Sequence, residues 1–353
     1  MFNRVLITGG AGFVGSSLAL HLRRVYPALE IVAFDNLHRR GSELNLPRLA
    51  DHGVRFVHGD VRSPEDLETI GERPDLIIEC SAEPSAHAGY GGSPGYLVRS
   101  NLEGCYHCLE FARRSHAGFL FLSTSRVYPY ARLNALPYRE TGTRFELEGE
   151  YARGIREDFP IEGARSLYGM TKLAAELMVT EYGEAYGFPH VINRCGVIAG
   201  PWQMGKTDQG VMALWSAAHY FKRPLAYIGF GGQGKQVRDV LHIEDLCELI
   251  TIQVRDFPQW SGRVVNAGGG REVSVSLREL TALCEEVTGN RTEIASRPET
   301  RAGDVRIYLS DCSRVEGFCG WTPRRSARDI VADTCTWIGA HESALRGVLL
   351  HQA

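Results

Sequence analysis

The sequence predicts an α/β protein built on a doubly wound parallel sheet, and three observations support this fold class. Apolar segments that begin at residues 4, 76, 119 and 190 have the composition of strands covered on both faces. Segments with helical periodicity separate these strands, so that the two element types alternate. A glycine-rich stretch stands between the first strand and the first helix. A smaller C-terminal lobe is expected to complete the molecule.

The glycine-rich stretch GGAGFVG connects the strand at residues 4–8 to the helical pattern SSLALHLRR. Glycines at these positions allow a tight turn and a close approach of the backbone to a pyrophosphate at the helix N-terminus. Asp35 ends the second strand, 20 residues after Gly15, where an acid binds the adenosine ribose. The pattern predicts a Rossmann-type dinucleotide site that includes Gly9, Gly12, Phe13, Val14, Gly15, Asp35 and Asn36.

Asp35 also indicates which dinucleotide is bound. A carboxylate there repels a 2′-phosphate and favours NAD over NADP. Arg39 and Arg40 follow closely, but we expect them to be solvated loop residues. The ends of later strands add Asp60 and Val61 beside the adenine, together with the loop residues Ser81 and Ala82.

Tyr168 and Lys172 lie four residues apart in SLYGMTKLAAE, a spacing that places both side chains on one face of a helix. Free tyrosine has a pKa of about 10, so a base near pH 7 needs a shift of about three units, or roughly 4 kcal/mol. A neighbouring ammonium favours the phenolate and supplies part of that shift. Thr124 ends the FLFL strand, at the sheet edge where a substrate hydroxyl could meet it.

The glycine pattern, Thr124, the Tyr168/Lys172 pair and the terminal lobe resemble the extended short-chain dehydrogenase/reductase family of nucleotide-sugar enzymes. The resemblance implies that Tyr168 transfers the proton of a sugar hydroxyl and that Lys172 holds the nicotinamide ribose and lowers the tyrosine pKa. It implies that Thr124 hydrogen-bonds the reacting oxygen and that Asn101 lies near the cofactor. Arg238 and Arg301 resemble the family's nucleotide- and pyrophosphate-binding arginines. Further candidate substrate contacts are Arg194, Gln203, Lys206, Asp208 and Gln209.

The residues after Thr124 bear on the reaction. The family's dehydratases carry Asp-Glu there, whereas this chain has Ser125 and Arg126, which disfavours dehydration. Epimerisation by transient oxidation, with hydride return to the opposite face of the ketosugar, needs the least machinery. Other nucleotide-sugar oxidoreduction or 4-epimerisation on the same scaffold, and a non-catalytic dinucleotide sensor, remain the alternatives.

Two segments, NRCGVIAGPWQMGKTDQG and GFGGQGKQVRDVLHIEDL, resemble those of the CDP-paratose 2-epimerase group, also called CDP-tyvelose epimerases. Tyr168 follows Tyr128 by 40 residues, which leaves room for an insertion at about residues 131–165. Val197 stands where most of the wider family has an asparagine. A CDP-linked sugar and reaction at C2 are therefore expected through this resemblance.

We expect a NAD-binding domain at residues 1–192, with a segment returning at about 239–268. The nucleotide-sugar-binding lobe would comprise residues 193–238 and 269–353. The family resemblance also implies a homodimer or homotetramer, paired through the helices at 101–114 and 167–186.

Composition is consistent with a cytoplasmic enzyme. The net charge is −3, with no basic run suited to nucleic acid or to a membrane surface. Nine scattered cysteines fit reduced thiols better than disulfides. Cys105 and Cys108 form a C-x-x-C within a helical pattern, where structural packing is expected and a metal or redox site is the alternative. No metal is expected.

Overall fold

The structure is a computed structural model that describes residues 2–205 and 210–349. It divides into two compact units, each made of separate stretches of the chain. The first unit comprises residues up to Val127, Leu167–Arg194 and Leu246–Val265, and the second comprises Tyr128–Ser166, Cys195–Asp245 and the residues from Asn266 on. The expected boundaries placed residues 128–166 in the first domain. In the structure this segment bonds within the second unit, where the Tyr128 hydroxyl donates to Asn266 Oδ1.

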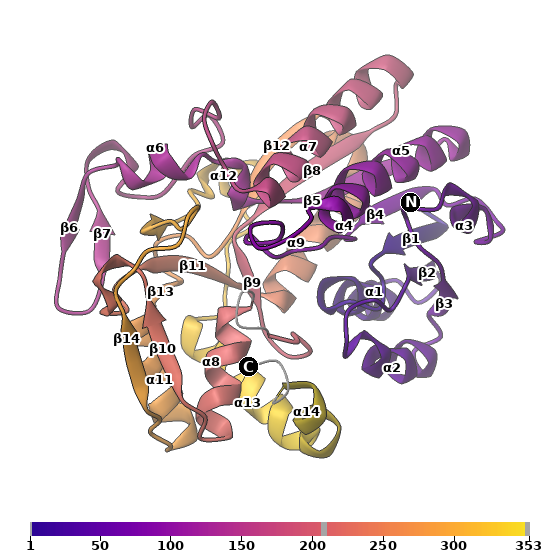
Figure 1. The fold of residues 1–353 in the computed structure, drawn as a ribbon. Helices are drawn as coiled ribbons and strands as arrows, with labels where there is room; N and C mark the ends of the chain where they lie inside the picture. Colours follow the sequence, from indigo (N-terminus) through magenta and orange to yellow (C-terminus); the bar gives the residue numbers. More distant parts are fainter. Residues whose placement is uncertain (1, 206–209, 350–353) are drawn as a thin grey trace. The chain divides into compact units, whose positions relative to one another are not determined.

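The first unit is built on a seven-stranded sheet whose strand order is β12-β8-β5-β4-β1-β2-β3 (Figure 1). From β3 through β5, neighbouring strands pair in parallel. The strand order reverses between β1 and β4, and in such sheets ligands bind outside the carboxyl ends of the strands at this point. The strands are β1 (Arg4–Thr8), β2 (Glu30–Asp35), β3 (Arg55–His58), β4 (Leu76–Glu79), β5 (Gly118–Thr124), β8 (His190–Cys195) and β12 (Arg263–Ala267).

Helices cover both faces of this sheet. α5 and α7 pack against each other over β4 and β5, and α1 packs on β1 and β2 (Figure 1). Leu6, Phe34 and Phe121 on the strands are fully buried in the core beneath α5 and α7. The helices are α1 (Phe13–Val25), α2 (Leu46–Asp51), α3 (Pro64–Glu68), α4 (Gly95–Val98), α5 (Gly104–Ser115), α7 (Leu167–Tyr186), α9 (Ile243–Arg255) and α10 (Phe257–Trp260), with short helical turns η1 (Ser42–Asn45), η2 (Arg99–Glu103) and η3 (Ser125–Val127).

The second unit combines small sheets with a helical layer. β11 pairs with β13, β15 and β9, β10 pairs with β14, and β6 and β7 form an antiparallel hairpin. α8, α11 and α13 pack together around Trp215, Leu280 and Ile330. The elements are α6 (Tyr130–Asn134), β6 (Tyr138–Glu140), β7 (Phe145–Leu147), η4 (Gly149–Tyr151), β9 (Val197–Ala199), α8 (Val211–Tyr220), β10 (Leu225–Ile228), η5 (Phe230–Gly232), β11 (Val237–His242), β13 (Ser274–Ser276), α11 (Leu277–Thr288), β14 (Ile294–Arg297), β15 (Ile307–Tyr308), α12 (Ser313–Cys319), α13 (Ala327–Ala340) and α14 (Glu342–Leu349).

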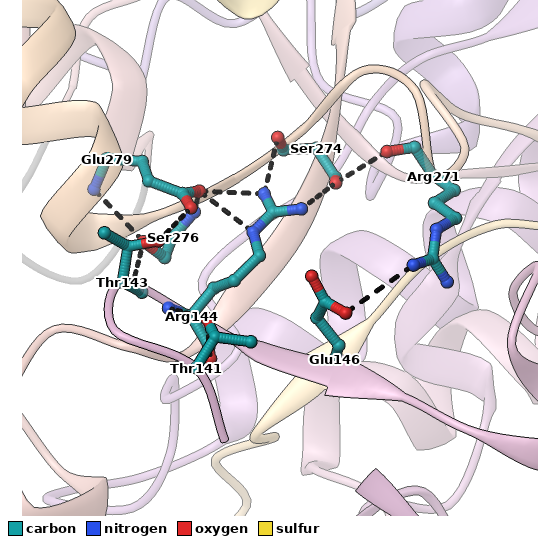
Figure 2. Close-up of polar contacts among 8 residues, drawn as sticks. All are labelled: Thr141, Thr143, Arg144, Glu146, Arg271, Ser274, Ser276 and Glu279. Carbon is teal, nitrogen blue, oxygen red and sulfur yellow. Dashed lines mark hydrogen bonds and ion pairs between the residues drawn. The ribbon is translucent and has the colours of Figure 1, made fainter. Parts of the chain in front are cut away.

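The insertion at 131–165 contains the β6–β7 hairpin, which is held to the start of α11. Ser276 and Glu279 form a capping box that begins this helix, and Glu279 also accepts hydrogen bonds from Thr143 and Arg144 of the hairpin (Figure 2). Phe145 and Leu147 are buried against Val237 of β11 and its neighbours. The insertion is therefore an integral part of the second unit's core.

Among the residues described, no helix has the length and the apolar composition needed to cross a membrane.

Candidate active site

The turn between β1 and α1 has no space for side chains at its glycines. A Cβ atom on Gly15 would lie 2.2 Å from the carbonyl oxygen of Gly9, and one on Gly10 would lie 2.6 Å from Ala33 Cα. Gly9 has a φ of +61°, and the Gly12 N–H donates to its carbonyl at 3.0 Å. α1 begins at Phe13, which Val14 follows. Its first turn has no side-chain cap and contains no acidic residue. The turn therefore presents bare backbone at the positive end of a helix, as a pyrophosphate requires.

The ends of β2 and β3 carry the expected adenosine contacts. Asp35 Oδ2 accepts the Ala11 N–H at 3.1 Å and Oδ1 accepts the Leu37 N–H at 2.8 Å. Burial raises the pKa of Asp35. The hydrogen bonds from Leu37 and Ala11 lower it, but by less than burial raises it. Asn36 donates to Asp60 at 2.8 Å. Burial alone would raise the pKa of Asp60, but hydrogen bonds from Arg62 and Asn36 outweigh it and lower the value to about 2.

Asn101 links the loop after β4 to α7. It lies in η2, a π-helical turn, and its Oδ1 accepts the Glu83 N–H at 2.8 Å. Its Nδ2 lies 3.2 Å from both the Glu83 carbonyl and Thr171 Oγ1. Asn101 therefore fixes the loop after β4 relative to α7. In that loop Ser81 is partly exposed and Ala82 is exposed, while Val61 after β3 is buried.

The three expected catalytic residues lie on two elements that pack together. Thr124 is the last residue of β5, and its Oγ1 accepts the Arg126 N–H at 3.2 Å. Tyr168 and Lys172 lie one turn apart on α7, which packs on β5. All three side chains are buried, with Lys172 only 2% exposed. The Lys172 ammonium lies 3.9 Å from the centroid of the Phe121 ring.

Two buried glutamates beside this set were not predicted. Glu79 ends β4, and its Oε2 lies 3.7 Å from Lys172 Nζ. Glu176 lies one turn beyond Lys172 on α7 and accepts hydrogen bonds from Ser123 at 2.5 Å and from Arg194 Nη2 at 2.8 Å. The four-residue spacing after Lys172 could have revealed Glu176. Glu79 could have been noticed as the acid that ends an otherwise apolar strand.

The expected substrate residues are divided between the two units. Arg194, in the first unit, holds Glu176 with both Nε and Nη2. In the second unit, Gln203 is buried and donates to the Ile198 carbonyl at 2.8 Å. Arg238 donates to the carbonyls of Val237 and Val305, and Arg301 is exposed on a turn closed by the Asp304 N–H. Lys206, Asp208 and Gln209 lie outside the described residues.

The C-x-x-C pair lies in α5. Cys105 and Cys108 are free thiols buried in the core of the first unit. Burial, and secondarily the charge of Glu79, raises the pKa of both thiols well above the ordinary range. Within the described part of the chain, no group of three or more histidines, cysteines or acids is arranged to hold a metal ion.

The chain is similar to known proteins in sequence and in structure. Residues 5–268 match the model of the "NAD dependent epimerase/dehydratase family". CDP-paratose 2-epimerase of Salmonella typhi is 29% identical over 347 residues, which cover 95% of this chain and 98% of that protein. A dTDP-glucose 4,6-dehydratase from an Actinoplanes species is 29% identical over 349 residues, covering 96% of this chain and 99% of that protein. The structure of Thermus thermophilus UDP-glucose 4-epimerase in complex with NAD is similar, with a TM-score of 0.78 and 26% identity over 95% of this chain and 99% of that one.

The chain therefore belongs to the NAD dependent epimerase/dehydratase family. It is an enzyme of that family, and the predictions of a Rossmann-type parallel sheet and of NAD as cofactor are confirmed. The glycine turn fits the dinucleotide, since any Cβ on Gly15 would occupy backbone space. The two relatives with 29% identity carry the names of different reactions, an epimerisation and a dehydration.

Proposed function

We propose that this enzyme is a nucleotide-sugar epimerase that inverts C2 of a CDP-linked sugar. The observation that carries the proposal is the set Thr124, Tyr168 and Lys172 at the end of β5 and the start of α7. Ser125 and Arg126 follow Thr124, so the acids that a dehydratase places there are missing. The similarity to CDP-paratose 2-epimerase over nearly the whole chain supports the choice of nucleotide and carbon.

Each residue of the proposed site has a separate role in proton transfer or in binding. Tyr168 accepts the proton of the sugar hydroxyl and returns it, and Thr124 hydrogen-bonds the same oxygen. Lys172 holds the nicotinamide ribose and favours the phenolate of Tyr168 by its charge. The glycine turn, Asp35 and Asn36 would hold NAD, and the bound cofactor would supply hydride removal from the sugar carbon and hydride return to its opposite face. The loss and the return of hydride cancel, so no second substrate is needed.

Several side chains have the chemistry that we propose for substrate binding. Arg238 and Arg301 suit the diphosphate, because guanidinium groups bind phosphate oxygens in a bidentate manner. Gln203, whose Oε1 has no hydrogen-bond partner among the described residues, has an acceptor left for a sugar hydroxyl. Lys206, Asp208 and Gln209 complete the proposed set, with Arg194 as a member on the first unit.

The test is turnover of CDP-sugars by the purified protein in deuterated buffer, followed by NMR. Inversion at C2 without deuterium at that carbon is expected, because the hydride does not exchange with water. Deuterium at C2 would contradict hydride return. Tyr168→Phe should lower turnover by at least about a thousandfold and leave bound NAD in place, since it removes the proton acceptor but no cofactor contact of the glycine turn.

The alternatives predict other results. A net oxidoreductase would change the NADH content in step with product, and a dehydratase would release a 4-keto-6-deoxy sugar. The similarity to dTDP-glucose 4,6-dehydratase is the observation that favours the dehydratase alternative. A dinucleotide sensor would turn over no nucleotide sugar and would bind a partner when its ligand is present.

Pairing of subunits through α5 and α7 is part of the proposal. Tyr106 on α5 and Leu177 and Tyr186 on α7 are 45%, 59% and 55% exposed, which is unusual for large apolar side chains. Leu177→Glu should convert a dimer or tetramer to a smaller species in sedimentation analysis. An unchanged sedimentation coefficient would rule out this surface.

A further inference from the structure

Glu79 is a buried carboxylate in the first unit. It lies at the carboxyl end of a central strand, next to the point where the strand order reverses. It is the last residue of β4, whose neighbours are β1 and β5. Its side chain is 2% exposed, as is that of Lys172. Taking two charged groups out of water costs free energy, so a buried pair at this location calls for an explanation beyond packing.

The contacts of Glu79 are those of a counter-ion. Its Oε2 lies 3.7 Å from Lys172 Nζ and has no hydrogen-bond partner within residues 2–205 and 210–349. The same ammonium lies 3.9 Å from the centroid of the Phe121 ring. The thiols of Cys105 and Cys108 on α5 also feel the charge of Glu79, and their raised pKa values keep them neutral. Lys172 is therefore the cation beside Glu79, whose carboxylate also accepts a backbone hydrogen bond from Ser81.

This arrangement affects Tyr168 through Lys172. A cation one helical turn away favours the phenolate, and a carboxylate beside that cation cancels part of its field. Burial raises the pKa of the Glu79 carboxyl, while the charge of Lys172 lowers it. The charge state of Glu79 thus determines how much positive field reaches the tyrosine.

We propose that Glu79 is a positioning residue, which fixes the Lys172 ammonium by charge and sets the pH range in which Tyr168 ionises. The inference rests on the proposed function only in taking Tyr168 as the proton acceptor. Glu79 itself touches no reacting atom in this scheme. Two observations support this role: Glu79 and Lys172 are both buried, and their charged groups lie 3.7 Å apart.

The test compares Glu79→Gln and Glu79→Asp in the NAD-loaded protein. Tyrosinate absorbance near 295 nm is titrated for each protein and for its Tyr168→Phe counterpart, so that the difference reports Tyr168 alone. Glutamine keeps the shape but removes the charge, and the midpoint should fall by about one pH unit. Aspartate keeps the charge and should restore most of the original midpoint. The acid limb of the rate profile should move with the absorbance.

Glu279→Gln is the matched control, a carboxylate of the second unit with its own arginine. It should leave the Tyr168 midpoint unchanged. A Glu79→Gln midpoint that stays in place or rises, in a protein with native circular dichroism, would overturn the proposal and would indicate that Glu79 is a neutral acid. The absorbance needs no turnover, so a shifted midpoint in a protein that epimerises no sugar would support Glu79 and refute only the proposed function.

Discussion

Arg144 and Glu279 join the insertion hairpin to the first turn of α11, although 135 residues separate them in the chain. Nε and Nη2 of Arg144 lie 3.0 and 2.8 Å from Glu279 Oε2, and Arg144 also donates to the carbonyl and hydroxyl of Ser274 (Figure 2). The same glutamate oxygen accepts the Ser276 N–H of the capping box. One carboxylate thus begins a helix and anchors the insertion.

Arg144→Met should therefore destabilise the protein by about 2 kcal/mol, since it removes charge-assisted hydrogen bonds at a partly buried site. Urea unfolding gives the free energy, and limited proteolysis within residues 138–147 should become faster. Arg139→Met is the control in the same hairpin, because Arg139 is 60% exposed and its solvent-screened pair with Glu146 should contribute little to stability. Equal losses in both variants would show that the Arg144 contacts have no special role.

This junction also shows what the sequence could not predict. The β-α alternation, the glycine turn and the Tyr168/Lys172 spacing are local patterns, and the parallel sheet that they predicted is confirmed. The residues around Arg144 and Glu279 in the sequence give no sign that the two side chains pair. A charged residue in a loop is predicted to be solvated unless a partner distant in the chain is known. The attachment of the insertion therefore emerged only from the folded chain.

Arg194 and Glu176 form a buried ion pair between β8 and α7. Both side chains are less than 10% exposed, so Arg194→Met would leave a buried carboxylate without its cation and should cost about 3–5 kcal/mol. Adding Glu176→Gln should recover much of the loss, as thermal or urea unfolding can measure. Arg113→Met, at the more exposed pair with Glu110 on α5, should lower the unfolding free energy far less, because solvent screens that pair.

The same double variant tests Arg194 as a substrate contact. If the guanidinium also binds the nucleotide sugar, the stability-restored protein should have a raised KM with little change in kcat. An unchanged KM would limit Arg194 to holding α7 on β8. The sequence alone could not separate these roles, because the pairing of Arg194 with Glu176 forms only once α7 is placed on the sheet.

Gly15→Ala tests the fit of the cofactor turn. The added Cβ would meet the Gly9 carbonyl at 2.2 Å, so the turn must open and its N–H groups must move. NAD released from the purified variant by heat and measured by chromatography should fall at least about tenfold relative to the wild type. Gly317→Ala on α12 meets nothing within 4 Å and should retain full NAD content, with stability unchanged or higher by up to about 1 kcal/mol. Full NAD content in Gly15→Ala would contradict this account of the turn.

Asp239 on β11 makes stability depend on pH. It is fully buried, and burial raises its pKa to about 6, even though Oδ2 accepts N–H groups from Ser310 and Gly270. Its Oδ1 has no hydrogen-bond partner among the residues described. Since the folded pKa is above the unfolded value of about 3.9, the folded state binds the proton more tightly. The contribution of this group is therefore complete below about pH 4 and is lost as pH rises through 6.

Asp239→Asn removes that loss, because an amide does not ionise. The unfolding free energy of the variant minus that of the wild type should rise by up to about 3 kcal/mol between pH 4 and pH 7, which corresponds to two pKa units. Urea titrations at several pH values measure the difference, and other titrating groups cancel in it. A constant difference for Asp239→Asn would mean that the buried carboxyl titrates in its ordinary range, with the backbone N–H groups offsetting its burial.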